Sequence, residues 1–153
     1  ADAEEETTYL LQSVAVLGQR LGVVLFQLPP NMKADTDRLA EFVSHIPTGA
    51  RAALEFRHPS WLEPATESIL ADRNFALCIA ETDEGHDPDL PATADWGYLR
   101  LRRTDYEDAD LARWAERVTQ LPWSDTFVYF KHEDDAAGPR LAARFLELGS
   151  TGS

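Results

Sequence analysis

The chain has 153 residues, with 14 Lys and Arg against 27 Asp and Glu, so its formal net charge is −13. This length suits a single domain with a real core, and the 44% apolar fraction argues against global disorder. An acidic protein is a poor candidate for broad binding to DNA or RNA, which needs a positive surface, although a local basic pocket stays open.

From the residues of this chain we expect neither a membrane-spanning helix nor a signal peptide. It has no run of 18 apolar residues that would predict a membrane-spanning helix. The acidic stretch 1–6 lacks the basic and apolar regions of a signal peptide, so we expect a cytoplasmic protein. The single Cys78 excludes an internal disulfide framework and a zinc site built from several cysteines.

The first segments predict a helix, a strand and a second helix. Apolar residues at helical spacing predict a helix over 7–20 with Leu10, Val14 and Leu17 on one face. The continuous apolar run 23–28 is typical of a strand covered on both sides. Asp35 is placed to cap a helix whose apolar stripe runs from Leu39 to Ile46.

The pattern then repeats to the end of the chain. We expect strands at 51–56, 75–80, 96–102 and 126–131, helices at 64–73, 107–119 and 138–148, a loop at 82–95 and a flexible tail at 149–153. Strict alternation predicts an α/β fold with parallel strands and right-handed crossovers, either as an open sheet or as a TIM-type β/α barrel. Neither a dinucleotide-binding fingerprint nor a phosphate-binding loop of the Walker type is present, so the common nucleotide-binding open sheets lose support.

Polar side chains gather where the strands end. Because alternate residues of a strand share one side, each strand has an apolar side and a side that turns polar toward its carboxyl end. The candidate site residues are Gln27, Glu55, Arg57, Glu81, Arg100, Arg102, Tyr129 and Lys131. Both architectures place ligands at this end of the strands, and four cations among the candidates suit an anionic ligand.

Three candidates are catalytic: Glu55 as acid or base, with His58 and Glu81 in support. Arg57 and Arg100 would clamp an anion. A structural interpretation stays open for each, since Glu55 with Arg57, or Glu81 with Arg100, could form buried ion pairs.

Two residues after the second strand carry alternatives of their own. His58 could act as a base or cap its loop through backbone hydrogen bonds, and Pro59 holds it extended. Trp61 could be a stacking wall for a ligand or an anchor for the next helix.

We predict no metal site. The acids and histidines that could compose one are Glu55, His58, Glu81, Asp83, His86, His132 and Glu133. Their spacing matches no metal motif, and the sequence identifies no cofactor.

Several motifs resemble one known family. The segments 21–30 (LGVVLFQLPP) and 55–61 (EFRHPSW) resemble the LG-x-x-LFQLPP and EFRHPSW segments of the DUF72 (YecE-like) family, and shorter matches continue over residues 10–148. The resemblance implies a TIM-type barrel of uncharacterised reaction. The family's GTSGW-like first strand has no counterpart, so the chain is similar to the last five β/α units of a barrel. Glu81 stands where the family often has Asp, and Arg102-Arg103 and Lys131-His132 replace His-Gly-like and Asn-Asn-like pairs.

Three functions follow as hypotheses. The chain is a barrel enzyme acting on a polar or anionic small molecule, or on a nucleic-acid-derived substrate, at the strand ends. Alternatively, it is a binding module without turnover. The third hypothesis is a domain that depends on self-association, or on the absent N-terminal half, to complete its barrel, since open sheet edges invite association.

Overall fold

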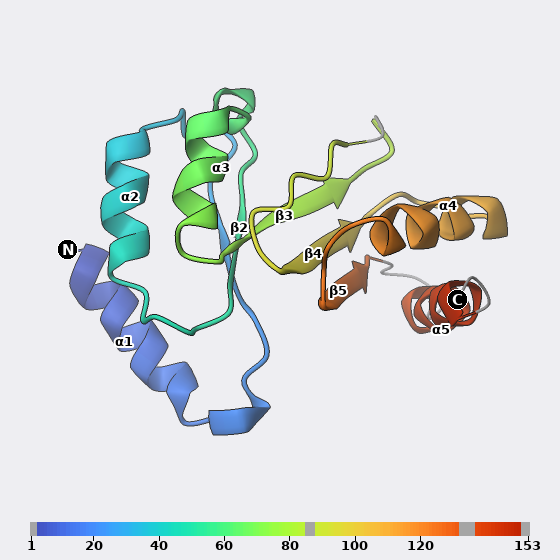
Figure 1. Cartoon of the computed structure of the whole chain (residues 1–153), viewed down its shortest axis with the longest axis horizontal. Coiled ribbons are helices and arrows are strands. Elements are labelled where there is room, and N and C mark those ends of the chain that lie inside the picture. The colour runs from blue at the N-terminus through green and yellow to red at the C-terminus, as the bar shows by residue number, and fades with distance from the viewer. Residues whose placement is uncertain (1–2, 85–87, 132–136, 151–153) are drawn as a thin grey trace. The chain divides into compact units, whose positions relative to one another are not determined.

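The computed structural model describes residues 3–84, 88–131 and 137–150, and the chain forms two compact units, residues 1–77 and 78–153. The elements are α1 (Ala3–Ala15), η1 (Gly18–Arg20), β1 (Val24–Gln27), α2 (Thr36–Ser44), β2 (Ala52–Glu55), η2 (Pro59–Trp61), α3 (Pro64–Ala71), β3 (Ala76–Glu81), β4 (Trp96–Leu101), α4 (Asp108–Thr119), β5 (Asp125–Phe130) and α5 (Ala137–Ser150). Within the described residues the strand order is β1-β2-β3-β4-β5 and every neighbouring pair is parallel, which confirms the α/β prediction (Figure 1). Whether the chain is a single domain stays a prediction.

The first unit packs α2 and α3, which lie side by side, against its strands (Figure 1). β1 pairs with β2 in a register that runs from Val24 opposite Ala52 to Gln27 opposite Glu55. The core is formed by Leu39, Val43, Ile46, Ala52, Leu54, Trp61, Leu70 and Phe75. The Asp35 carboxylate accepts the backbone N–H of Arg38 at 3.0 Å, so this predicted cap is confirmed.

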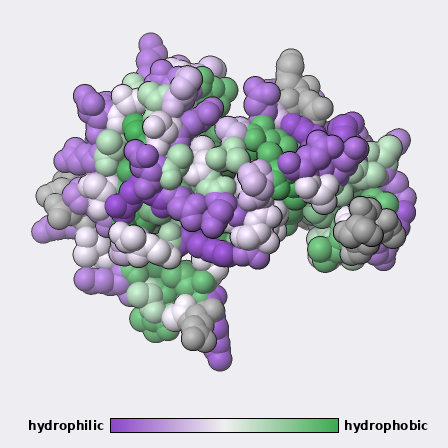
Figure 2. Space-filling view, viewed as in Figure 1, coloured by the Kyte–Doolittle hydropathy of each residue, from purple (hydrophilic) through white to green (hydrophobic). Residues whose placement is uncertain are grey.

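The N-terminal helix differs from the expectation. α1 ends at Ala15 and is followed by the short turn η1, because Gly18 takes a positive φ of 53° that interrupts the helical period. Its apolar residues are not buried: Leu10 is 41% exposed and Leu17 52%, and Tyr9 and Val16 are more exposed still. They contribute to an apolar patch over the end of α1 and η1 (Figure 2).

The second unit packs α4 and α5 against β3, β4 and β5. β4 pairs with the last four residues of β3 and with the whole of β5. Its core contains Ile79, Leu99, Leu101, Tyr106, Leu111 and Trp114. Gly97 is required near the start of β4, because a Cβ there would lie 2.3 Å from the ring of Trp123.

The last helix is longer than expected. α5 runs to Ser150, so residues 149–150 of the predicted tail are helical, and 151–153 lie outside the described residues. None of the helices described here is long and apolar enough to cross a membrane.

Candidate functional site

The two sides of the sheet in the second unit are chemically distinct. Leu99 and Leu101 contact α4 and α5, together with Ile79, Val128 and Phe130. Tyr98 and Arg100 alternate with these leucines, so they lie on the side away from the helices, and Arg100 is opposite Tyr129 in the register. The predicted alternation of an apolar and a polar side therefore holds for β4 and β5.

Two tyrosines form the centre of the polar side. The rings of Tyr98 and Tyr129 are 5.1 Å apart and tilted by 31°. Tyr98 is buried, whereas Tyr129 is 49% exposed. Burial, reinforced by Tyr129, raises the pKa of Tyr98 to about 12, although Arg100 acts in the opposite direction. Tyr98 is therefore a neutral phenol at neutral pH, beside a guanidinium group.

Two further cations follow at the carboxyl ends of these strands. The backbone N–H of Arg102 donates to the carbonyl of Glu81 at 2.9 Å, and that of Lys131 donates to the carbonyl of Leu101 at 3.0 Å. These bonds continue the parallel ladder beyond β4 and β5. The Arg102 Nε atom is buried and has no hydrogen-bond partner in the described part of the chain.

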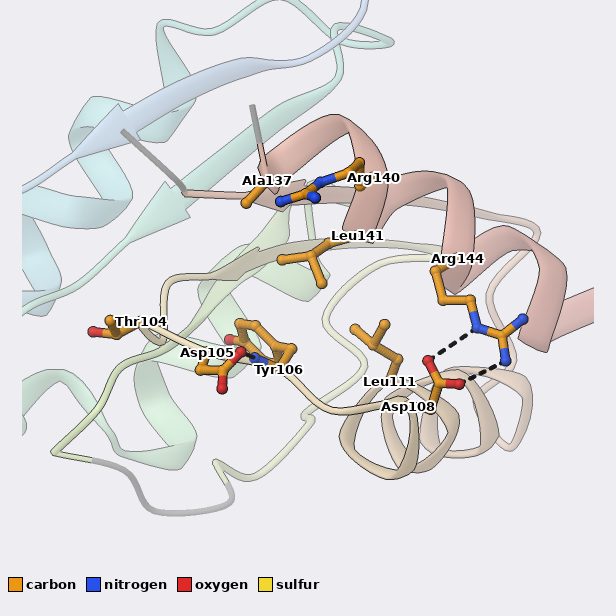
Figure 3. Close-up of a pocket in the computed structure, with 9 residues that line it drawn as sticks. All are labelled: Thr104, Asp105, Tyr106, Asp108, Leu111, Ala137, Arg140, Leu141 and Arg144. Carbon is orange, nitrogen blue, oxygen red and sulfur yellow. Dashed lines mark hydrogen bonds and ion pairs between the residues drawn. The ribbon is translucent and has the colours of Figure 1, made fainter. Parts of the chain in front are cut away.

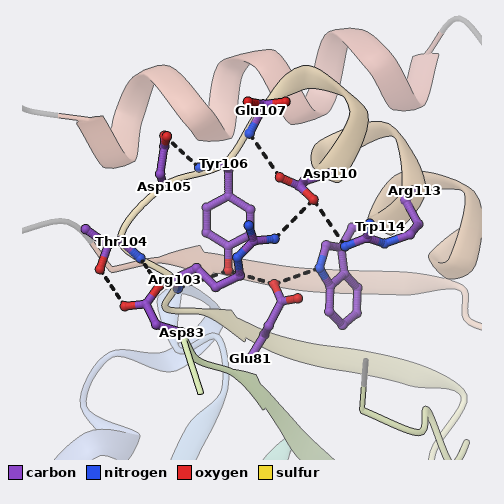
Figure 4. A network of polar contacts seen from close by, with 10 residues as sticks. All are labelled: Glu81, Asp83, Arg103, Thr104, Asp105, Tyr106, Glu107, Asp110, Arg113 and Trp114. Atoms are coloured by element: carbon purple, nitrogen blue, oxygen red, sulfur yellow. Dashed lines mark hydrogen bonds and ion pairs between the residues drawn. The ribbon is translucent and has the colours of Figure 1, made fainter. Parts of the chain in front are cut away.

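Glu81 lies on the other side of the sheet, contrary to the expectation. It is opposite Leu101 in the register and 4% exposed. Its Oε2 atom accepts the Tyr106 hydroxyl at 2.8 Å and the Trp114 indole N–H at 2.9 Å (Figure 4). The side chain thus faces α4, and its observed role is to connect β3 to that helix.

The same network fixes the loop that follows β4. Arg103 forms an ion pair with Asp110 at 3.1 Å and lies over the Tyr106 ring, 5.0 Å from its centroid (Figure 4). Thr104 donates its backbone N–H to Asp83 at 2.6 Å. Burial raises the pKa of Tyr106, so its hydroxyl stays a donor to Glu81.

In the first unit, Gln27 and Glu55 are neighbours at the ends of β1 and β2. Leu54 belongs to the core beneath α2 and α3, so Glu55 lies on the opposite side of β2, although it is only 2% exposed. Arg57 follows and is exposed. The register thus places two of the predicted candidates, an amide and a carboxylate, at adjacent strand ends.

His58 and Trp61 have structural roles. His58 Nδ1 accepts the backbone N–H of Ser60 at 3.2 Å and lies 2.8 Å from its hydroxyl oxygen, so His58 caps η2. Trp61 is 2% exposed, stacks on Phe56 at 4.7 Å and donates its indole N–H to the carbonyl of Met32. Of the two interpretations of Trp61, the structure shows the anchor, because a buried ring presents no open face to a ligand.

The structure thus brings together two groups of predicted residues, each within its own unit. One is Gln27 with Glu55, and the other is Arg100 with Tyr129. Sequence reasoning did not assign Tyr98 to the site, although its position two residues before Arg100 was a usable signal. No three His, Cys, Asp or Glu side chains of the described residues lie close enough to hold a metal ion, and His86, His132 and Glu133 fall outside that part.

The comparisons with known proteins agree on one family. The family model described as "Protein of unknown function DUF72" matches residues 1–152. No curated protein matches the chain.

Solved structures of similar fold come from two bacteria. A DUF72 family protein from Enterococcus faecalis V583 matches with a TM-score of 0.75 and 17% identity, covering 98% of this chain and 67% of its own. A DUF72 family protein from Thermotoga maritima MSB8 matches with a TM-score of 0.73 and 23% identity, and the match covers 99% of this chain and 66% of that protein. The chain therefore has the fold of about two thirds of these proteins, a partial TIM-type barrel.

Proposed function

Because the chain belongs to the DUF72 family of unknown function, we propose a function from its own residues: it binds an anionic small molecule at the strand ends. Arg100, Arg102 and Lys131 supply the positive charge, and the neutral Tyr98 and exposed Tyr129 supply hydroxyl groups and a ring surface. Phosphate and carboxylate groups share the geometry that an Arg fork recognises. A nucleic-acid-derived molecule would be bound through its phosphate by the same chemistry.

The observation that supports this proposal is the Arg102 Nε atom. It is a buried donor without a partner among the described residues. Leaving such a donor unsatisfied costs about 1–3 kcal/mol, and more for a charged group. An oxygen of a bound anion would remove this cost. Two other buried polar groups of the described residues also lack a partner. The Thr66 hydroxyl lies in α3, and Trp123 Nε1 belongs to the ring against Gly97 at the start of β4, so neither is at a strand end.

We propose further that the protein is an enzyme, with Glu55 as its acid or base and Arg57 as an anion clamp. Support comes from the burial of Glu55 at a strand end, where parallel α/β proteins carry their catalytic groups. Gln27 and His58 would assist from adjacent positions. Glu81 and Trp61 have no part in this proposal, because both face the helix side.

Binding is tested by NMR titration of the protein with two probes, inorganic phosphate and succinate. We expect the Arg102 Nε–Hε resonance to shift and saturate with at least one of them. Arg102→Gln and Arg100→Gln should each weaken binding about tenfold, the effect of losing a hydrogen bond to a charged group. Arg38→Gln, an exposed arginine of α2, is the matched control. Shifts that never saturate, or equal effects of all three variants, would contradict the proposal.

Catalysis is tested with Glu55→Gln, which keeps the shape of the side chain. Phosphate and carboxylate compounds that raise the melting temperature are followed by NMR for turnover. We expect Glu55→Gln to keep affinity and lose turnover, while Glu41→Gln on the exposed side of α2 keeps both. Compounds that bind tightly but are never turned over would favour the binding module without catalysis.

A second function has separate support. Exposed apolar patches mark interaction sites. Tyr9 and Leu10 of α1 are exposed, as are Val16 and Leu17 in the turn between α1 and η1. We propose that this patch associates with another chain or segment. Light scattering should show a mass above the monomer that rises with concentration, and Val16→Ser with Leu17→Ser should lower it. A monomer at every concentration would contradict association of this chain with itself.

A further inference from the structure

A cavity lies on the helix-facing side of the second unit, apart from the group around Arg100. It lies between the loop after β4, the start of α4 and the first turns of α5, and has a volume of about 330 Å³ (Figure 3). Thr104, Asp105, Tyr106, Asp108, Leu111, Ala137, Arg140, Leu141 and Arg144 line it. Its volume is at the lower end of the range for small-molecule sites, which suits a ligand of about ten non-hydrogen atoms.

One pair of charges in this cavity is already satisfied. Arg144 binds Asp108 with two hydrogen bonds, from Nε at 2.9 Å and from Nη2 at 2.7 Å, and also contacts Glu147 at 2.9 Å. These contacts hold the pKa of Asp108 below its usual value. The pair forms a neutral wall that joins α4 to α5.

Two opposite charges remain. Arg140 lies one helical turn before Arg144, and its side chain makes no ion pair or hydrogen bond with the described residues. Asp105 accepts the backbone N–H of Tyr106 at 2.9 Å through one carboxylate oxygen and is otherwise exposed. The cavity therefore offers one cation and one anion to a ligand.

The surface between these two charges is apolar. Leu141 lies between Arg140 and the loop that carries Asp105, and Leu111 lies farther along the cavity (Figure 3). Leu111 is buried and belongs to the core beneath α4. A ligand that reached both charges would cross this apolar surface.

We propose that this cavity binds a small amphoteric molecule, with its anionic group toward Arg140, its ammonium group toward Asp105 and an aliphatic segment over Leu141. A ligand with one charge would contact only one of these two charged side chains. The proposal does not depend on the function assigned to the strand ends.

Three probes that each contain six carbons separate the contributions: 6-aminohexanoate, hexanoate and hexylamine. They are titrated into the labelled protein while the methyl resonances of Leu111 and Leu141 are followed. We expect 6-aminohexanoate to bind about fivefold more tightly than either single-charge probe, since an exposed charge pair contributes up to about 1 kcal/mol. Equal affinity of hexanoate and 6-aminohexanoate, or no shift of these methyl groups, would overturn the proposal.

Two variants assign each charge. Arg140→Gln should weaken the binding of 6-aminohexanoate and of hexanoate but leave the binding of hexylamine unchanged. Asp105→Asn should weaken 6-aminohexanoate and hexylamine only, and its amide oxygen still accepts the Tyr106 N–H, so the loop should keep its shape. Arg38→Gln is the control for lost surface charge. If either variant weakened the binding of all three probes, or of none of them, the assignment would be overturned.

Discussion

Replacement of Glu81 by alanine tests whether this buried carboxylate anchors the loop after β4. Its Oε2 atom accepts hydrogen bonds from two buried donors, the Tyr106 hydroxyl and the Trp114 indole N–H. Each donor left without a partner costs about 1–3 kcal/mol, so the free energy of unfolding should fall by about 2–6 kcal/mol. Glu81→Gln should cost less, because an amide oxygen still accepts both donors without the charge.

The assay is urea unfolding, followed by far-UV circular dichroism and tryptophan fluorescence. Glu116→Ala is the matched control, since Glu116 is an exposed acid on the same helix that Glu81 contacts. Its free energy of unfolding should stay within about 0.5 kcal/mol of the parent value.

The decisive comparison uses a background in which the two donors are absent. In the double variant Tyr106→Phe and Trp114→Phe, removal of the Glu81 carboxylate leaves no donor unsatisfied. In this background Glu81→Ala should lower the free energy of unfolding by clearly less than it does in the parent protein. The difference between the two values is the interaction free energy of Glu81 with its two donors. An equal cost in both backgrounds would refute the reasoning, because the loss would then come from the cavity alone.

The remaining predictions concern stability. Burial raises the pKa of Tyr98 to about 12 in the folded protein, against 10 in the unfolded chain. The unfolded chain therefore loses this proton first, and the free energy of unfolding should fall as the pH rises from 10 to about 12. In urea unfolding across this range, Tyr98→Phe should reduce the dependence of that free energy on pH. Gly97→Ala should destabilise by about 1–3 kcal/mol, because its Cβ would collide with Trp123, and Trp123→Ala should remove most of that cost in the same assay. Asp35→Ala should cost about 1 kcal/mol by thermal unfolding, while Asp35→Asn, which keeps the acceptor for Arg38 N–H, should cost little.

The fold was predictable where the signals are local. Asp35 caps α2 and Pro64 begins α3, as expected, because capping and the fixed φ of proline depend on a few neighbouring residues. The apolar runs gave the strands within a residue or two. The burial of α1 was not predictable, because helical spacing defines an apolar face but does not say what covers it.

The site was predictable only in part, for a similar reason. Alternation correctly placed Arg100 and Tyr129 on one side of the sheet, because the residues next to each of them in its strand are large and apolar and lie on the side that faces the helices. In β3 the neighbours Cys78 and Ala80 are small and fit either side, so the alternation could not show that Glu81 faces α4. The register with β4 decides this, and register depends on residues distant in the sequence.

The division of β4 and β5 into two faces has a consequence for how such a protein can change. Every second residue supports the helices, and the residues between them include those that we propose to face a ligand. A library randomised at Tyr98, Arg100 and Tyr129 should therefore retain a packed second unit in many of its members, because Leu99 and Leu101 would be untouched. Selectivity for new ligands could then be selected on this scaffold without rebuilding its core.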